Sequence, residues 1–498
     1  GDLGGVVRKL LRPSSFILVV YLFVLLPLTG FGFTSVLAQG IAVPPFISGE
    51  LMKDQVTAAA WLLLMFALAF LNLRFALTLP IFVLTGATGG RAMRLSWRIT
   101  RGRAMLSLLL AVASVLAAAA IATIALMIAA LAPTAIADEA APDASPLVAA
   151  FSLGAAQLVG LLITATVTAT IGGVLVAFLA RFKDRLPQDV LLHELQPGPE
   201  PRLSRRTTGT VFAAGCVAAA LGLGVAAIPT LTHLSEHPDT IVLAHRGFTA
   251  GGVENTICGL EAASEAGADL VEMDAMQTQD GSFIAMHDAN LLRLTGQDVR
   301  VKDLTLDELT AMTVSAGGLE CAIPSLADYV IRAAELEMQL LIEIKLGGLD
   351  TPDHVQLLID ELESLDIPGD VNALERNIYH TLDARSAAEL KAARPDLTVG
   401  YIMPFAGGGA PDTPADFVVI EESSASEELQ REVWDAGLGF FAWTVNEDPA
   451  IREHLRRNSD GIITDHPDTA LAAREEMRDQ TGLADTLFDA LTRFVVVF

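Results

Sequence analysis

The sequence is short of cysteine, of aromatic residues and of charge. Only 3 of its 498 residues are cysteine, 6% are aromatic and 18% are charged, whereas 52% are hydrophobic. Cys216, Cys258 and Cys321 show neither a disulfide-framework spacing nor a C-x-x-C motif. We therefore expect buried free thiols, with one bridge between Cys258 and Cys321 as the alternative. The hydrophobic share exceeds that of ordinary soluble domains and indicates membrane segments.

Basic residues are scarce in the second half of the chain. Residues 1–237 hold 16 Lys/Arg and 11 Asp/Glu, a net charge of +5, whereas residues 238–498 hold 17 and 48, a net charge of −31. Such an acidic half argues against a nucleic-acid partner, because binding to phosphates needs a positive surface. We predict two regions of different physical character, with a boundary near residue 235.

Five long apolar runs lie in the first half. A helix of about 20 apolar residues spans the roughly 30 Å hydrocarbon core of a bilayer, and each run reaches that length. We predict a multi-span α-helical transmembrane domain over 1–232. Its five spans are 16–37, 57–79, 104–131, 147–182 and 210–231. A break at Gly172-Gly173, or a separate short segment over 75–84, would change this count.

Ionisable residues are almost absent from these runs. Because such residues mark ion and substrate paths through a bilayer, their scarcity favours anchoring or lipid contact over transport. Arg74, near the end of its span, is expected to snorkel towards the interface.

Lysine and arginine are concentrated in alternate connections between the runs. The positive-inside rule then places the N-terminus in the cytoplasm, and five spans place the acidic half outside. We expect a multi-pass plasma-membrane protein with an extracytoplasmic C-terminal domain. A signal peptide in the first run, with Val36 and Ala38 at cleavage positions, is the alternative, although its apolar stretch exceeds the usual length of about 7 to 15 residues. Gly1 is not a methionine, and we expect further sequence before it.

From residue 240 onward, short β-rich runs alternate with amphipathic stretches, which is typical of a parallel sheet with crossover helices. Nine runs begin at 241, 269, 283, 339, 378, 398, 417, 439 and 461. The third follows too closely for a crossover helix, so we expect an antiparallel arm there. Eight βα units remain, which predicts an α/β TIM barrel, (β/α)8, with a doubly wound open sheet as the rival. The predicted linker, barrel and amphipathic tail cover 233–240, 241–475 and 476–498.

Charged residues gather at the carboxyl ends of the predicted strands, the face that forms the active site of a barrel. Glu272 and Asp274 lie two apart on one strand and therefore point to the same side. Two carboxylates in one cavity repel unless a cation lies between them, and a hard divalent ion is the usual solution. Glu343 would complete a three-carboxylate metal site, with the positive charge of Lys345 beside it.

Two histidines and an arginine share this face. His245 and His287 provide the two proton-transfer groups that phosphodiester cleavage requires. Arg246 offers a planar fork for phosphate oxygens. The remaining histidines of this region, His380 at a strand end among them, lack such company and are predicted to be surface or structural residues.

These residues stand within seven blocks that resemble the glycerophosphodiester phosphodiesterase family. In order over about 240–470, the blocks are AHRG…ENT, GADLVEMDAMQTQDGSFIAMHDANLLRLTG, VKDLTLDEL, IPSLADYV, LLIEIK, FAWTVN and DGIITDHP. The membrane half is similar, more loosely, to the transmembrane region that precedes some bacterial members, through LRFALTLPIFVL and RLSWRITRG.

The resemblance implies a distorted (β/α)8 barrel that hydrolyses glycerophosphodiesters to an alcohol and sn-glycerol 3-phosphate with Ca²⁺ or Mg²⁺. It also implies roles for individual residues: His245 and His287 as the acid/base pair, Arg246 and Lys345 as phosphate ligands, Trp443 against the glycerol, Glu272, Asp274 and Glu343 as metal ligands, and Glu254 and Asn255 as braces of the first loop. Val253 replaces a proline that is frequent in the family, TGQDVRVKD is shorter than in many members, and IYHTLD replaces a segment that often contains Ser-Phe. These departures bear on substrate preference more than on activity.

The expected partners are a glycerophosphodiester or phospholipid-derived substrate and the lipid bilayer. The linker enters the first strand at its amino end, so the barrel mouth is expected to face sideways or away from its own membrane. The tail is apolar enough to touch a membrane or a neighbouring subunit, and a homo-oligomer or a membrane-complex partner stays open. The alternative functions are a lysophospholipase-D-like or sphingomyelinase-D-like hydrolase, or a non-catalytic, membrane-anchored binding or assembly module.

Overall fold

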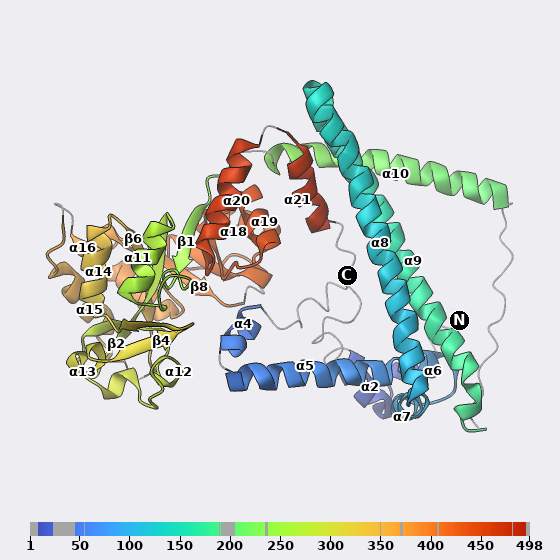
Figure 1. Ribbon diagram of the computed structural model, residues 1–498, viewed down its shortest axis with the longest axis horizontal. Coiled ribbons are helices and arrows are strands. Elements are labelled where there is room, and N and C mark those ends of the chain that lie inside the picture. The colour runs from blue at the N-terminus through green and yellow to red at the C-terminus, as the bar shows by residue number, and fades with distance from the viewer. Residues whose placement is uncertain are drawn as a thin grey trace. The chain divides into compact units, whose positions relative to one another are not determined.

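The chain forms two compact units. The computed structural model describes residues 8–22, 45–53, 55–188, 190, 205–234, 238–348, 350–368, 372–405, 408–480 and 482–494. One unit comprises 1–232 together with 482–498, and the other comprises 233–481. Figure 1 shows the first unit as long helices and the second as an α/β body.

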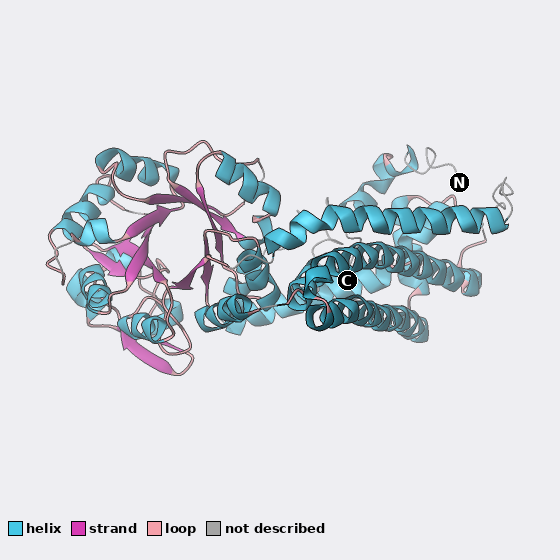
Figure 2. Cartoon of the chain, turned by 90° about the horizontal axis from the view of Figure 1, so that it is seen from above, coloured by secondary structure: helices cyan, strands magenta, loops and turns pink. Residues whose placement is uncertain are grey.

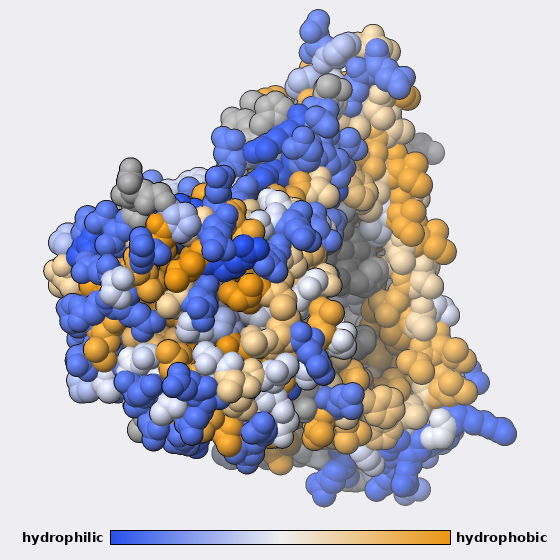
Figure 3. Space-filling view, turned by 60° about the vertical axis from the view of Figure 1, so that its left-hand side comes forward, coloured by the Kyte–Doolittle hydropathy of each residue, from blue (hydrophilic) through white to orange (hydrophobic). Residues whose placement is uncertain are grey.

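Four helical segments of the first unit, within its described residues, are long and apolar enough to cross a membrane. They are Gln55–Leu84, Arg103–Ala140, Pro142–Arg181 and Gly209–Pro229, which correspond to the second to fifth predicted spans. Most of the first predicted span, 16–37, lies outside the described residues. In Figure 3 apolar surface runs along the long helices, whereas hydrophilic and apolar residues are mixed on the face of the barrel.

The described helices of this unit follow the predicted runs in part, because the helices over 45–53, 89–99 and 484–494 lie outside those runs. They are α2 (Phe16–Val20), α4 (Pro45–Lys53), α5 (Gln55–Phe75), α6 (Thr78–Leu84), α7 (Gly89–Ile99), α8 (Arg103–Ala140), α9 (Ser145–Arg181), α10 (Arg205–Leu234) and α21 (Ala484–Phe494). The structure separates α6 from α5, whereas α9 continues through Gly172-Gly173.

The prediction that Arg74 snorkels is wrong. Its side chain is only 6% exposed, and its guanidinium donates hydrogen bonds to the backbone carbonyls of Trp97 and Thr100. The guanidinium carbon also lies 4.3 Å from the centre of the Trp97 ring. Helix ends leave carbonyls without partners, and a cation is well placed to satisfy them. Arg74 therefore closes the carboxyl end of α7.

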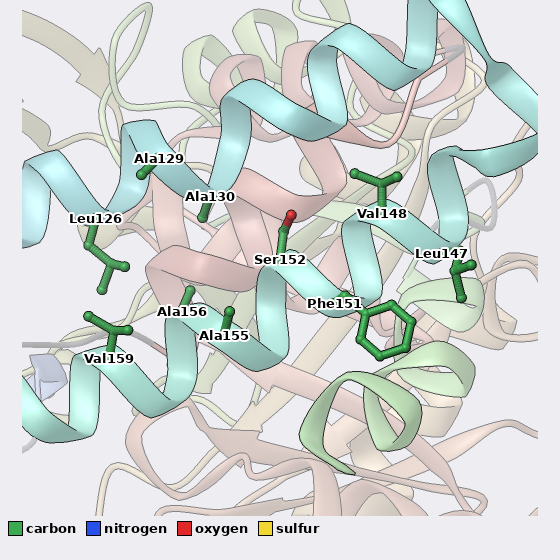
Figure 4. A pocket seen from close by; sticks show the side chains of 10 residues that line it. All are labelled: Leu126, Ala129, Ala130, Leu147, Val148, Phe151, Ser152, Ala155, Ala156 and Val159. Carbon is green, nitrogen blue, oxygen red and sulfur yellow. The ribbon is translucent and has the colours of Figure 1, made fainter. Parts of the chain in front are cut away.

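Helices α8 and α9 form a hairpin against which the C-terminal helix packs. A cavity of about 500 Å³ opens between them, lined largely by alanine and aliphatic side chains such as Leu126, Ala130 and Val159 (Figure 4). Helix α21 contacts both α8 and α9, and its Leu487 and Leu491 side chains are buried. The tail, predicted to touch a membrane or a neighbouring subunit, thus packs on helices of its own chain.

The second unit is the predicted closed barrel, seen in Figure 2 as a ring of strands within a ring of helices. Its sheet has the order β1-β11-β10-β9-β8-β7-β6-β2-β3 and closes through a β1–β2 pair. All pairings of the ring are parallel, whereas β3 pairs antiparallel with β2, as predicted. The strands are β1 (Ile241–His245), β2 (Leu270–Gln277), β3 (Phe283–Ala285), β6 (Gln339–Lys345), β7 (Ile378–Thr381), β8 (Val399–Met403), β9 (Phe417–Glu421), β10 (Gly439–Trp443) and β11 (Gly461–Thr464).

Helices cover the outside of the ring, and an insertion follows β3. The insertion contains the hairpin of β4 (Thr313–Ala316) and β5 (Leu319–Ala322), which the sequence pattern did not predict. Side chains of Thr256, Thr305, Ser325, Asp383 and Ser426 cap helix starts in this unit. The helices are α11 (Ile257–Glu265), α12 (Leu292–Thr295), α13 (Leu306–Thr310), α14 (Leu326–Glu335), α15 (His354–Glu363), α16 (Ala373–Arg376), α17 (Ala384–Ala393), α18 (Glu427–Asp435), α19 (Asp448–Arg456) and α20 (Pro467–Asp479). Helix α20 runs past residue 475, where the barrel was predicted to end.

The expectation of free thiols at Cys258 and Cys321 is wrong, because the two form a disulfide. Their Cα atoms lie 6.5 Å apart, within the range that a disulfide spans. The bridge ties β5 of the insertion to the start of α11 across 63 positions of sequence. Cys216 is free.

The period of two along each strand sorts the interior of the barrel into layers. Large apolar side chains, among them Leu243, Leu341, Val419 and Ile463, fill the lower interior. The next inward position, two residues later, is polar: His245, Glu343 and Glu421 end or lie on their strands, and Asp465 directly follows β11. The change from apolar to polar marks the floor of a site at the carboxyl ends of the strands.

Candidate active site

Four neighbouring strands bring the predicted site residues together. Strand register places His245 of β1 beside Glu272 of β2, and Asp274 of β2 beside Glu343 of β6. It also places Glu343 beside His380 of β7. These side chains are all buried, so their charges meet in a medium that screens them poorly.

Asp274 is surrounded by donors and cations. It accepts a hydrogen bond of 2.8 Å from Asn255 Nδ2, and its two oxygens lie 3.3 Å from Arg246 Nε and 3.3 Å from Lys345 Nζ. Burial alone would raise the pKa of Asp274, but Lys345, His287 and Arg246 hold it well below its ordinary value. Asp274 is therefore ionised at neutral pH.

Lys345 bridges two of the carboxylates. Its Nζ lies 3.0 Å from Glu343 Oε1 as well as beside Asp274, and these acids raise the pKa of Lys345 although burial opposes them. Burial raises the pKa of Glu343 even with Lys345 beside it, since Asp274 and Glu272 are also close. More negative charge is gathered here than the lysine neutralises.

His380 belongs to this cluster, contrary to the prediction that it lacks polar company. Its side chain is 2% exposed, and its Nε2 lies 3.5 Å from Glu272 Oε1. Glu272, Glu343 and His380 each offer one atom that can bind a metal ion, and these three atoms lie within 4.8 Å of one another. Neither ring nitrogen of His380 has a hydrogen-bond partner within the described residues.

This donor set fits a divalent cation. Three buried carboxylates, two of them grouped with an imidazole nitrogen, supply the oxygen-rich environment that Ca²⁺ and Mg²⁺ prefer. Glu272 and Glu343 are common to this group and to the predicted ligand set, whereas Asp274 is held by Asn255, Arg246 and Lys345.

The first predicted proton-transfer group, His245, is oriented by a residue that the sequence analysis missed. Its Nδ1 lies 2.7 Å from Asp465 Oδ1, directly after β11. Asn446 fixes Asp465 in turn, by donating from Nδ2 to Oδ2 at 2.6 Å and accepting from the Asp465 backbone N–H at 2.8 Å. A carboxylate on Nδ1 leaves Nε2 as the nitrogen for chemistry.

The second, His287, has its own carboxylate and a chain of charges behind it. Its Nδ1 lies 2.8 Å from Asp288 Oδ1. Arg293 donates to Asp288 at 2.6 Å and to both oxygens of Glu254 at 2.8 and 2.7 Å. Burial would raise the pKa of Asp288, but His287 and Arg293 lower it further than burial raises it. Arg293 lies in the insertion and was not predicted from the sequence.

The loop after β1 presents Arg246 in an unusual backbone conformation. Arg246 and Asn255 have φ angles of 57° and 54°, in the left-handed region that residues other than glycine seldom adopt. The Arg246 backbone N–H donates to Glu272 Oε2 at 3.0 Å, and its Nη1 lies 3.3 Å from Glu254 Oε1. The Asn255 side chain accepts from the Asp274 backbone N–H at 3.0 Å. Hydrogen bonds with Glu272, Glu254 and Asp274 therefore hold the loop in the conformation that presents Arg246.

Trp443 stands across the mouth from the acidic cluster. It ends β10, is half-buried against the apolar interior of the barrel, and its bond to Thr444 is cis. Register places Glu421 of β9 beside it, and Glu421 is fully buried. An aromatic wall opposite a charged floor can receive a small polar molecule that carries an anion.

Sequence comparison gives two family matches and several relatives. Residues 245–469 match the glycerophosphoryl diester phosphodiesterase family, and residues 2–216 match the membrane domain of glycerophosphoryl diester phosphodiesterase. A glycerophosphodiester phosphodiesterase of Caldanaerobacter subterraneus subsp. tengcongensis is 29% identical over 246 residues, covering 47% of this chain and 96% of that protein. One from Bacillus altitudinis is 29% identical over 255 residues, covering 48% and 100%.

A solved phosphodiesterase structure from Oleispira antarctica, in complex with the product sn-glycerol-3-phosphate, is 22% identical to this chain with a TM-score of 0.42. The match covers 47% of this chain and 96% of the Oleispira antarctica chain.

Proposed function

We propose that this chain, a member of the glycerophosphoryl diester phosphodiesterase family, hydrolyses glycerophosphodiesters to an alcohol and sn-glycerol 3-phosphate at the outer face of the membrane. The observation that carries the proposal is the convergence of two carboxylate-backed histidines, an arginine and a lysine on one buried acidic cluster. Phosphodiester hydrolysis needs both proton transfer and compensation of charge on the phosphoryl group, and this site offers both.

His245 and His287 supply the proton transfers. One takes a proton from the attacking nucleophile, and the other gives a proton to the oxygen of the departing alcohol, so that the overall reaction consumes one water. Asp465 and Asp288 hold the two rings by Nδ1, which orients Nε2 towards the substrate. The two carboxylates also stabilise each ring while it carries a positive charge.

Arg246 and Lys345 bind the phosphoryl oxygens. Arg246 is buried, Lys345 is partly buried, and carboxylates position both cations, so little reorganisation is needed when charge develops on the phosphate. Trp443 packs against the glycerol, while Glu254 and Asn255 brace the loop that carries Arg246.

A divalent cation, Ca²⁺ or Mg²⁺, would be held by Glu272 and Glu343, with Asp274 or His380 as the third protein ligand. When bound there, such an ion would supply the Lewis-acid charge that polarises a phosphoryl oxygen. The buried negative charge in excess of Lys345 is the reason to expect it.

The disulfide supports the outer location of the barrel. Disulfides persist in oxidising compartments and are rare in the bacterial and eukaryotic cytosol, and Cys258–Cys321 lies in the barrel unit. The lysine and arginine residues in the connections between spans also support an outer location. They place the N-terminus in the cytoplasm, and five spans of the plasma membrane then place the barrel outside.

The test is product release by the purified full chain. We expect glycerophosphocholine and glycerophosphoglycerol to yield sn-glycerol 3-phosphate, and Glu343→Gln to abolish turnover while the barrel stays folded by circular dichroism. If the wild-type protein, saturated with Ca²⁺ or Mg²⁺, releases no phosphomonoester from either diester, the proposal fails and a non-catalytic binding module becomes the better account.

A further inference from the structure

Helix α7 of the helical unit is a short amphipathic helix that joins two candidate spans. Its 11 residues are too few to cross a bilayer, which takes about 20. Ala92, Leu95 and Ile99 on its buried face belong to a core that also contains residues of α6, of the start of α8 and of the end of α9. Figure 1 shows α6 and α7 beside that end of the α8–α9 hairpin. Three of the candidate spans begin or end around α7, which places this helix at a membrane surface.

The opposite face of α7 is basic. Arg94 and Arg98 on the helix and Arg101 just beyond it recur at helical spacing, and all three are exposed. Trp97 is 36% exposed, and its ring centre lies 5.5 Å from that of Phe75 on α5. Arginines beside a tryptophan on a short amphipathic helix are typical of the interface between lipid and water.

The adjoining ends of α8 and α9 add further arginines. Arg185, just after α9, donates from Nη1 to the backbone carbonyl of Ile99 at the end of α7, at 2.9 Å. Arg181 at the end of α9 and Arg103 at the start of α8 are exposed, as Arg185 is. Six exposed arginines therefore gather where these helices meet. We name them the basic surface: Arg94, Arg98, Arg101, Arg103, Arg181 and Arg185.

Negative charge is scarce around the basic surface. Over the described segments 75–104 and 178–188, Asp184 is the only acidic residue. None of the six arginines forms an ion pair with a carboxylate of the described residues. Like charges that the fold holds close together repel one another, so an anionic partner that covers them is favoured.

We propose that the basic surface binds the headgroup phosphates of anionic phospholipids. Such headgroups lie at the level where spans end, and the guanidinium group matches phosphate oxygens in charge and in geometry. Trp97, exposed among the arginines of α7, would lie at the same level, where tryptophan is favoured. This inference concerns the helical unit and goes beyond the hydrolysis proposed for the barrel.

The experiment measures which phospholipid the purified full chain retains. Native mass spectrometry counts the lipids kept from detergent micelles that contain dioleoylphosphatidylglycerol and dioleoylphosphatidylcholine in equal amounts, two lipids with the same acyl chains and different net charge. We expect the wild type to retain the anionic lipid about tenfold more than the zwitterionic lipid. The variant Arg94→Gln, Arg98→Gln, Arg101→Gln should lose most of that preference, whereas lysine at the same three positions should keep it within about threefold, because the charge remains.

The matched control removes the same charge from the barrel unit. Arg332→Gln, Arg385→Gln, Arg478→Gln changes three arginines whose side chains are 37%, 73% and 41% exposed and lie beside carboxylates. This control should retain the two lipids in the same ratio as the wild type.

Equal retention of the two lipids by the wild type overturns the inference. A preference that survives in the glutamine variant, or that the barrel control loses to the same extent, also overturns it, because the binding would then not depend on the basic surface. Loss of the preference in the lysine variant overturns it too, since packing and not charge would be responsible. If circular dichroism shows that the glutamine variant is unfolded, the three single glutamine variants replace it, each with an expected loss of about twofold or more. The measurement involves no turnover, so its result is independent of the proposed function.

Discussion

Both units of the chain hold buried or partly buried cations, but the groups that pair with those cations differ. In the helical unit, Arg74 donates to the carbonyls of Trp97 and Thr100, and Lys9 donates to those of Phe82 and Thr85. Those acceptors are neutral backbone groups at helix ends, so the cation completes the local structure and nothing further is required.

At the candidate site in the barrel, the cations face carboxylates. Lys345 lies beside Asp274 and Glu343, and Arg246 lies beside Asp274 and Glu254. The cluster holds three carboxylates, of Glu272, Asp274 and Glu343, and two cations, Arg246 and Lys345. The site can therefore take a further cation, and the two cations can bind an anion. Among these four cations, the two with carbonyl partners complete helix ends, whereas the two with carboxylate partners lie at the proposed site of chemistry.

Removal of the Lys345 ammonium from between the carboxylates should have the largest effect on activity. Lys345→Met should lower kcat/KM for glycerophosphocholine by about a thousandfold, because the phosphoryl group loses a preorganised positive charge. Lys302→Met is the matched control, since the Lys302 ammonium lies 3.7 Å from Asp303 outside the cluster. Steady-state kinetics measure both, and near-wild-type activity in Lys345→Met would remove the lysine from the site.

The corresponding change in the helical unit should affect stability and leave the chemistry alone. Arg74→Met leaves the carbonyls of Trp97 and Thr100 without their donor and should reduce the free energy of unfolding of that unit by about 2 to 4 kcal/mol. Thermal unfolding in nanodiscs measures the loss, and hydrolysis of glycerophosphocholine per folded molecule should be unchanged. A fall in kcat comparable to that of Lys345→Met would show that the two kinds of cation do not differ as described.

Asp465 tests whether a carboxylate that touches no substrate acts through its histidine. Asp465→Asn should lower kcat about tenfold to a hundredfold with little change in KM, because His245 loses the charge that holds and stabilises it. Asp465→Glu should recover part of the loss. The exposed Asp468, replaced by Asn, is the control. A rise in KM with kcat unchanged would instead assign Asp465 to substrate binding.

Glu361 on α15 is a partly buried carboxylate that has no cation beside it among the described residues. Burial and the nearby Asp280 raise the pKa of Glu361 to about 7, although a hydrogen bond from the Phe283 backbone opposes them. An acid whose pKa is higher in the folded state binds more protons there, so the barrel should lose stability as pH rises from about 4.5 to 7. Glu361→Gln should flatten that dependence and, allowing for partial exposure, stabilise the barrel at pH 8 by about 1 kcal/mol. Thermal unfolding as a function of pH measures it, and a parallel dependence in both proteins would contradict the assignment.

Much of the barrel could be predicted from the sequence, because its strands are short apolar runs at regular spacing. The antiparallel arm at β3 followed from the short distance to β2 and from turn residues. The β4–β5 hairpin could not be predicted in this way, since three of the four residues in each strand are exposed and carry no alternating apolar pattern. The strand ends then pointed to Glu272, Asp274, Glu343 and Lys345, which the structure brings together.

The missed residues depend on strand order and on loops. His380 enters the cluster because β7 pairs with β6, and Asp465 reaches His245, 220 positions away, because β11 closes the ring against β1. Arg293 comes from an insertion whose path no periodicity describes. The Cys258–Cys321 pair gave no spacing signal for the same reason, as its partners meet through the insertion.

Release of sn-glycerol 3-phosphate from glycerophosphocholine tests the proposed hydrolysis. The purified wild-type chain and His245→Ala are each assayed with Ca²⁺, with Mg²⁺ and with chelator. We predict turnover by the wild type with at least one of the two ions, no turnover in chelator, and a loss of about a hundredfold or more in His245→Ala. Full activity in chelator, or His245→Ala as active as wild type, would contradict the account.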